Sequence, residues 1–128
     1  MKRGDIYTAN LRPRSGAEIQ SNNPRPVIVI SHDGFNQVPT WQSVIVIPIS
    51  TSQTQAKRGS TAIFLRSDAE RHERHSQRRR WERENDSIAV CHQITTLDRS
   101  KLVHKIGTLS AELLQPVENG IKIALDMF

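Results

Sequence analysis

The chain has 128 residues, a single cysteine and a formal net charge of +5. This length predicts one domain that buries a sizeable core without disulfides or metals, and one cysteine excludes an internal disulfide and favours a reducing compartment. No apolar run approaches the roughly 20 residues of a membrane span, and no apolar signal-peptide segment follows Met1. We therefore expect a soluble, cytoplasmic protein whose charge favours polyanionic partners such as RNA, DNA or an acidic protein segment.

Short apolar runs bounded by turn residues predict two strands in the first third of the chain. Residues 6–11 alternate well enough for a first strand, and residues 12–24 have the proline, glycine, serine and asparagine content of a loop. Residues 27–30 are a continuous β-branched run, which predicts a buried strand over 27–31, and Pro26 stands at the start of this strand, where no ladder N–H is lost. A turn at 33–34 and a connector over 35–42 follow.

The remainder predicts more short strands and one terminal helix. The strands are expected at residues 44–49, 61–65, 87–91 and 105–109, with an edge or bulge near Pro48. Ser110 has the character of an N-cap, and apolar residues then recur at helical spacing. Pro116 and Gly120 predict a kink or a late start in this helix. The fold class predicted is mostly β with a C-terminal helix, as a small antiparallel barrel.

Residues 67–84 do not fit a barrel, because they are almost entirely charged or polar. Such a segment cannot bury enough apolar surface to offset its ordering entropy, which predicts a solvated, mobile insertion. Two alternatives stay open. The segment is either a basic arm that holds a nucleic-acid backbone, with Trp81 available for base stacking, or a docking element for a partner.

Polar residues stand at the ends of three predicted strands, and together they suggest chemistry on a phosphate. Arg25 precedes the strand at 27–31, Ser50 and Thr51 follow the strand at 44–49, and His92 follows the strand at 87–91. Histidine exchanges protons near neutrality, and an arginine with a hydroxyl can stabilise the charge of a phosphorane. This set suits transesterification of RNA, in which the 2′-OH is the nucleophile.

Each of these residues also has a structural interpretation. Arg25 could cap a strand end, Ser50 and Thr51 could form a turn, and His92 could be a satisfied structural histidine. A metal site is not expected. His72 and His75 lie in the charged segment, and Cys91 and His92 would point to opposite faces of a strand.

Taken in order, several stretches of the chain resemble the MazF/PemK family of toxins from bacterial toxin–antitoxin pairs. They are residues 2–7, 16–18, 25–30, 35–36, 44–50, 93–98 and 105–110, together with the final helix. The resemblance implies one SH3-like (CcdB/PemK-type) barrel domain over residues 1–128, with a charged insertion at about 57–84, that forms a homodimer. It also implies sequence-specific cleavage of single-stranded RNA to 2′,3′-cyclic phosphate and 5′-hydroxyl ends, without a metal or other cofactor, and inhibition by a cognate antitoxin.

Roles follow from the resemblance by position. Arg25 matches the catalytic arginine of the family, Ser50 stands where a catalytic threonine is usual, and His92 stands where some members use an acidic base. Glu18 and Gln93 match positions that contact RNA in relatives, and Thr51 lies beside Ser50. Two positions depart from the family. Val90 replaces an arginine that serves as general acid in some members, and Thr95 stands where an arginine is common.

Two other functions remain open at this stage. A gyrase poison of the CcdB type would share the fold, but the effect in that family depends on a C-terminal tail bearing tryptophan, and this chain ends Asp126-Met127-Phe128. A barrel that binds RNA or a partner without cleaving it is the second alternative, and the changes at Val90 and Thr95 keep it open.

Overall fold

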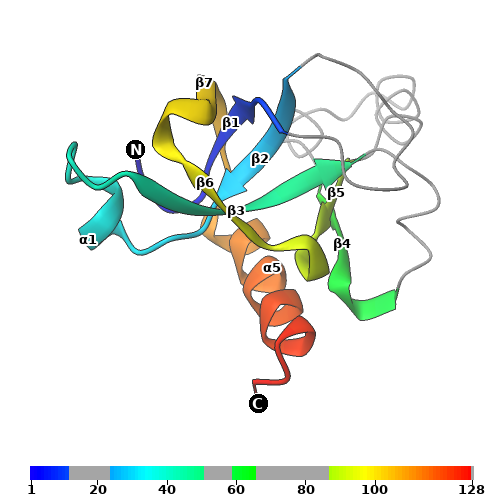
Figure 1. Ribbon diagram of the computed structural model, residues 1–128. Helices are drawn as coiled ribbons and strands as arrows, with labels where there is room; N and C mark the ends of the chain where they lie inside the picture. Colours follow the sequence, from blue (N-terminus) through cyan, green and yellow to red (C-terminus); the bar gives the residue numbers. More distant parts are fainter. Residues whose placement is uncertain (12–23, 51–58, 66–86, 128) are drawn as a thin grey trace. The chain divides into compact units, whose positions relative to one another are not determined.

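The computed structural model describes residues 1–11, 24–50, 59–65 and 87–127 (Figure 1). These residues form two compact units. The first unit comprises Met1–Pro48 and Ile94–Leu109, and the second comprises Ile49–Gln93 and Ser110–Phe128. Glu18, Thr51 and the charged segment 67–84 lie outside the described residues, so the expectations about them remain predictions.

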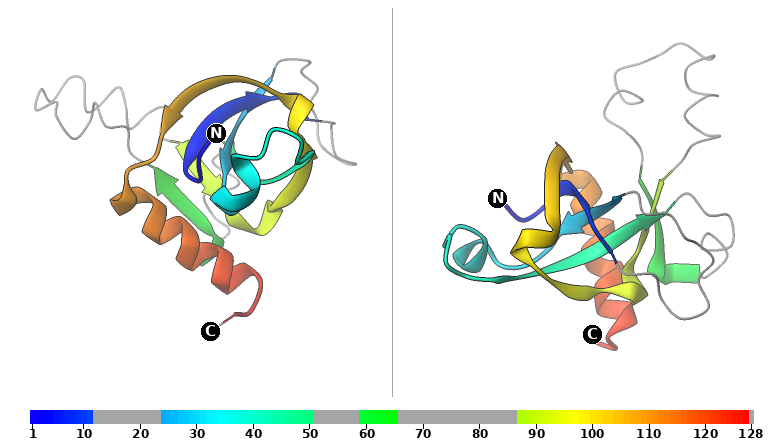
Figure 2. Two further views of the ribbon diagram at one scale, coloured as in Figure 1. Left: turned by 90° about the vertical axis from the view of Figure 1, so that its left-hand side faces the viewer. Right: turned by 45° about the horizontal axis from the view of Figure 1, so that its top comes forward.

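The first unit is an antiparallel sheet in the order β6-β3-β2-β1-β7. Its strands are β1 (Asp5–Ala9), β2 (Arg25–Val29), β3 (Ser43–Ser50, of which residues 43–48 belong here), β6 (Thr95–Asp98) and β7 (Leu102–Thr108). The strands curl, as the left view of Figure 2 shows, and they hold a small apolar core. The fully buried members of this core are Ala9, Val27, Val29, Val44 and Val46.

Strand β2 begins at Arg25, two residues before the predicted start. Arg25 and Pro26 extend the ladder because they stand opposite Ala9 and Thr8 of β1. Pro48 stands opposite Val27 on one edge of β3, while on the other edge the pairing with β6 ends at Val46. A proline is tolerated at that point because it lies beyond the ladder in which its missing N–H would be needed.

Two elements of the first unit were not predicted from the sequence. The first is a one-turn helix, α1 (Asp33–Asn36), which covers the predicted turn and the start of the predicted connector. Its N-cap His32 accepts a hydrogen bond from the Gly34 N–H through Nδ1 at 2.7 Å. The second is strand β6, which is short and rich in threonine and is defined by its pairing with β3 through four residues. The 3₁₀ turn η3 (Arg99–Lys101) connects β6 to β7, which starts at Leu102, earlier than predicted.

The second unit places one helix against a small sheet. Its elements are the end of β3 (Ile49 and Ser50), η1 (Gly59–Thr61), β4 (Ala62–Leu65), β5 (Ser87–Val90), η2 (Cys91–Gln93) and α5 (Ala111–Ala124). Strand β5 pairs antiparallel with both β3 and β4. Helix α5 packs against β4, η1 and η2. Ala62, Ile88 and Val90 form a buried cluster between the paired strands.

Helix α5 begins where its N-cap predicts it. The Ser110 hydroxyl accepts a hydrogen bond from the Leu113 N–H, and the helix starts at Ala111. The expectation of a late start is therefore wrong, because Pro116 lies within a helix that runs without interruption to Ala124. Pro116 removes one internal donor, and the burial of Val117 and Gly120 just beyond it supplies packing that isolated helix propensity omits.

The strand predicted at 87–91 ends one residue early, at Val90, because Cys91 opens the turn η2. Cys91 and His92 therefore do not alternate across a strand. The observed elements confirm the predicted fold class, a mostly antiparallel β structure with one C-terminal helix. Across the described ranges, no helix has both the length and the apolar composition needed to cross a bilayer.

Candidate functional site

Arg25 opens strand β2 in the first unit. Its neighbour across the ladder is the buried Ala9, and the buried Val27 follows two residues later, so the backbone at Arg25 is continuous with the core. The residue itself is exposed. The prolines on either side restrict the backbone torsions around it. The guanidinium of Arg25 therefore faces solvent from the rigid end of a strand.

Ser50 ends strand β3 in the second unit. It stands opposite Ile88 of β5, and the preceding pair is Ile49 with Ala89. Ile49, Ile88 and Ala89 are all buried, whereas Ser50 is half-buried. The hydroxyl is therefore carried by the last rung of a ladder whose other members are fixed in the core.

His92 sits on a turn that is anchored by its neighbour. Cys91 is fully buried, and its Sγ lies 3.6 Å from the carbonyl oxygen of Val117 on α5. Gly120 of the same helix comes so close that a Cβ placed on it would lie 2.7 Å from the Cys91 Sγ. Burial raises the pKa of the Cys91 thiol to about 11, so this residue acts as an apolar anchor and is not a nucleophile. The next residue, His92, is exposed.

The ring of His92 contacts a residue that the sequence did not single out. The His92 Nδ1 lies 3.2 Å from the Thr61 Oγ1, at the junction of η1 and β4. The β4–β5 register explains this contact. Ala62 stands opposite Val90. Thr61, just before Ala62, and Cys91, just after Val90, therefore lie at the same end of the ladder, and His92 follows Cys91 directly. Nothing in the sequence marks the contact, because its two residues are 31 positions apart.

The described site residues fall in both units. Arg25 belongs to the first unit, and Ser50, His92 and Gln93 belong to the second. Within the second unit, Ser50 stands beside the start of β5 and His92 follows its end. Only about 7 Å of extended chain separates Ile88 from Val90. The side chains of Ser50 and His92 therefore flank a very short strand. Gln93 is half-buried at the end of η2.

By the family resemblance, Val90 stands where some members carry an arginine that serves as general acid. It is a core residue here, 1 % exposed and packed with Ala62 and Ile88. Its environment suits an apolar side chain and would penalise a charged one. Among the described residues, no three histidine, cysteine, aspartate or glutamate side chains gather in a way that could hold a metal ion.

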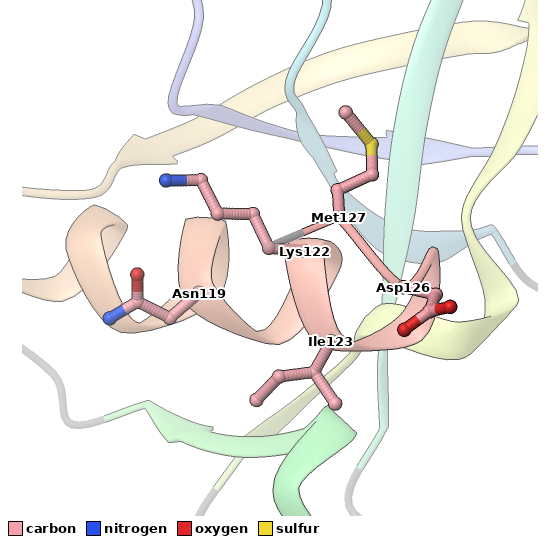
Figure 3. Close-up of a pocket in the computed structure, with 5 residues that line it drawn as sticks. All are labelled: Asn119, Lys122, Ile123, Asp126 and Met127. Atoms are coloured by element: carbon pink, nitrogen blue, oxygen red, sulfur yellow. The ribbon is translucent and has the colours of Figure 1, made fainter.

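A separate hollow of about 740 Å³ lies along the C-terminal half of α5 (Figure 3). It is lined by Asn119, Lys122, Ile123, Asp126 and Met127. These residues recur at helical spacing, so they form one face of the helix and the turn that follows it. None of the candidate catalytic residues lines this hollow.

Comparison with known proteins relates the chain to one toxin family along nearly its whole length. The family model for PemK-like, MazF-like toxins of type II toxin–antitoxin systems matches residues 2–125. The endoribonuclease EndoA of Bacillus subtilis is 31% identical over 125 residues, covering 98% of this chain and 94% of that protein. The endoribonuclease MazF of Staphylococcus saprophyticus is 27% identical over 127 residues, covering 99% and 92%.

A solved structure agrees at the level of the fold. A mycobacterial endoribonuclease, determined in complex with its cognate antitoxin, superposes with a TM-score of 0.70 at 13% identity. The match covers 100% of this chain and 97% of that one. At this identity the likeness concerns the fold alone.

Proposed function

We propose that this chain, which belongs to the PemK-like, MazF-like toxin family of type II toxin–antitoxin systems, is an endoribonuclease that cleaves single-stranded RNA by transesterification. The observation that carries the proposal is the end-to-end match with EndoA, at 31% identity over 98% of the chain. A CcdB-like gyrase poison is not favoured, because the curated relatives that match over nearly the full length are endoribonucleases.

In the proposed reaction, His92 removes the proton from the 2′-OH, and the resulting oxygen attacks the adjacent phosphorus. The bond to the 5′-oxygen breaks, leaving a 2′,3′-cyclic phosphate and a 5′-hydroxyl. The exposed guanidinium of Arg25 stabilises the added negative charge of the phosphorane, and the Ser50 hydroxyl donates to a non-bridging oxygen. No metal takes part in this scheme.

The departing 5′-oxygen must gain a proton, and Val90 cannot supply one. Its side chain has no ionisable group and lies in the core. The proton therefore comes from Arg25 or from a water molecule.

Substrate contacts are proposed for Glu18, Thr51 and Gln93. Gln93 follows His92 directly in η2, so the anchored turn would present an amide beside the base. An amide can both donate to and accept from a base edge, which suits sequence-specific reading of an unstacked nucleotide. Glu18 and Thr51 are assigned by position alone.

The partners proposed are a cognate antitoxin and a second copy of the chain, acting in the cytoplasm. A mycobacterial structural neighbour was determined with its own antitoxin. The net charge of +5 favours both RNA and an acidic inhibitory segment. The homodimer is proposed from the family resemblance.

The test is cleavage of a long single-stranded RNA in EDTA, followed by sequencing of the product ends. Discrete cuts by the wild type, reduced on the order of 10²-fold or more in His92→Ala, are expected from loss of a general base. Thr96→Val, at an exposed position of β6, is the control and should cut like the wild type. Binding without any cleavage by the wild type would leave a non-catalytic module and reject the proposal.

A further inference from the structure

We propose that Thr61 is a positioning residue that fixes the ring and the tautomer of His92 by accepting a hydrogen bond from Nδ1–H. The inference extends the proposed function, in which His92 is the base. Thr61 would not touch the RNA. It would act through the imidazole, whose Nδ1 lies 3.2 Å from the Thr61 Oγ1.

Both partners in this contact are attached to a rigid framework. Thr61 is followed by the buried Ala62, which stands opposite the buried Val90 in the β4–β5 ladder. His92 is preceded by Cys91, which is wedged against Gly120 of α5. Both turns, η1 and η2, pack on that helix. The distance between hydroxyl and ring is therefore set by the core of the second unit.

The direction of the hydrogen bond decides which nitrogen can act as a base. A neutral imidazole carries its proton on one nitrogen and a lone pair on the other. If the Thr61 hydroxyl donated to Nδ1, the proton would sit on Nε2, and that nitrogen could not accept another. If Nδ1–H donates to the Thr61 oxygen, the lone pair is on Nε2, where it can accept the 2′-OH proton.

Only the second arrangement survives the reaction without rearrangement. When His92 becomes an imidazolium, both ring nitrogens are donors, and Nδ1–H can keep the same bond to Thr61. A hydroxyl accepts in either state, so the ring would stay in place as its charge changes. We therefore assign the Nδ1–H tautomer to the neutral His92.

The tautomer can be tested on the full-length protein without RNA, by ¹⁵N chemical shifts of the histidine ring. We expect the Nδ1–H signature for His92 in the wild type and in Thr61→Ser, which retains a hydroxyl. Thr61→Val is nearly isosteric and lacks the acceptor, so its His92 should lose that single signature. An unchanged Nδ1–H signature in Thr61→Val would overturn the proposal.

Kinetics then separate positioning from a structural effect. Thr61→Val should lower kcat roughly tenfold, a part of the 10²–10⁴-fold that a positioned base supplies, with KM little changed. Thr61→Ser should recover most of the loss. In a His92→Ala background, Thr61→Val should cost nothing further. An equal loss in both backgrounds would show that Thr61 does not act through His92, whereas full activity of His92→Ala would reject the base but leave the ¹⁵N result standing.

Discussion

Arg25 is the residue on which the proposed chemistry depends most directly. Its position combines an exposed guanidinium with a backbone paired to the core, an arrangement that suits a cation needed at one fixed place. A guanidinium also presents two parallel donors to phosphate oxygens, which a lysine ammonium does not. The geometry of the fork should therefore matter as well as the charge.

Replacing Arg25 tests this role. Arg25→Ala should raise the activation barrier by about 3–4 kcal/mol, the usual loss for one fixed donor, and so reduce kcat on the order of 10²–10³-fold. Arg25→Lys should recover only part of this. Single-turnover cleavage of a defined RNA oligonucleotide measures both. Lys101→Ala, which removes an exposed cation from η3, serves as the control, and Arg25→Ala activity within tenfold of the wild type would reject the assignment.

Cys91 gives a prediction on stability and pH. Its thiol has a pKa of about 11 in the folded protein, against an ordinary value of 9.0, because burial disfavours the thiolate. Between these values the unfolded chain has released the proton and the folded chain has not. The contribution of the protonated Cys91 thiol to the free energy of unfolding is therefore complete below about pH 9 and is lost as the pH rises toward 11.

Urea denaturation across pH 8–11 checks this sign. The free energy of unfolding of the wild type should fall more steeply above pH 9 than that of Cys91→Ala, because the variant lacks the titrating group. Comparing slopes removes the contribution of other groups that titrate in the same range. Parallel slopes for the two proteins would contradict the buried, protonated thiol.

At the scale of elements, the contact between α5 and η2 holds His92 in place. Gly120 is buried, and an added Cβ would meet Cys91 Sγ at 2.7 Å and Ile63 Cγ1 at 3.1 Å. A glycine inside a helix ordinarily weakens it by about 1 kcal/mol relative to alanine. Here α5 approaches η2, the turn that carries His92, so closely that position 120 requires glycine.

Gly120→Ala should therefore destabilise the protein despite the gain in helix propensity. Overpacking typically costs about 1–3 kcal/mol, and a displaced η2 should also lower cleavage activity. The urea midpoint and kcat measure the two effects. Cys91→Ala in the same chain removes the closest clash and should recover part of both. Asn119→Ala, at the exposed neighbouring position, should change stability by no more than about 0.5 kcal/mol.

The elements that could be predicted from sequence are those with a strong local pattern. The run Val27–Val29 reads as a buried strand, and the spacing from Leu113 to Ile121 reads as a helix behind the Ser110 cap. Strand β6 lacks such a pattern, since it is short and rich in threonine, and only its pairing with β3 defines it. Helix α1 is one turn long, and besides the cap from His32 it is held by contacts with distant residues, such as the hydrogen bond from the Arg3 N–H to the Asp33 carboxylate.

The candidate site likewise has a part that could be predicted from the sequence and a part that could not. Arg25, Ser50 and His92 were proposed because polar residues at strand ends stand out against apolar runs. The contacts that support His92 were not predictable. Thr61 reaches it through the β4–β5 register, and Gly120 reaches Cys91 through packing between distant segments. Both depend on tertiary placement, which carries no local signature.

At the scale of the whole molecule, the chain combines an antiparallel β framework with a positive net charge of +5 and a family match over residues 2–125. The paired strands supply rigid strand ends, and the charge favours a polyanionic substrate. Two relatives that match over nearly the whole chain are endoribonucleases. In the proposed reaction, the substrate's own 2′-OH is the nucleophile.

That claim is tested most directly by a single 2′-deoxy substitution. After the cut site is mapped, two RNA oligonucleotides are compared in EDTA, one entirely ribose and one with a deoxyribose immediately 5′ to the scissile phosphate. We expect the first to yield a 2′,3′-cyclic phosphate and a 5′-hydroxyl by mass spectrometry, and the second to stay intact at that bond. Cleavage of the deoxy-substituted strand at the same bond would contradict the mechanism.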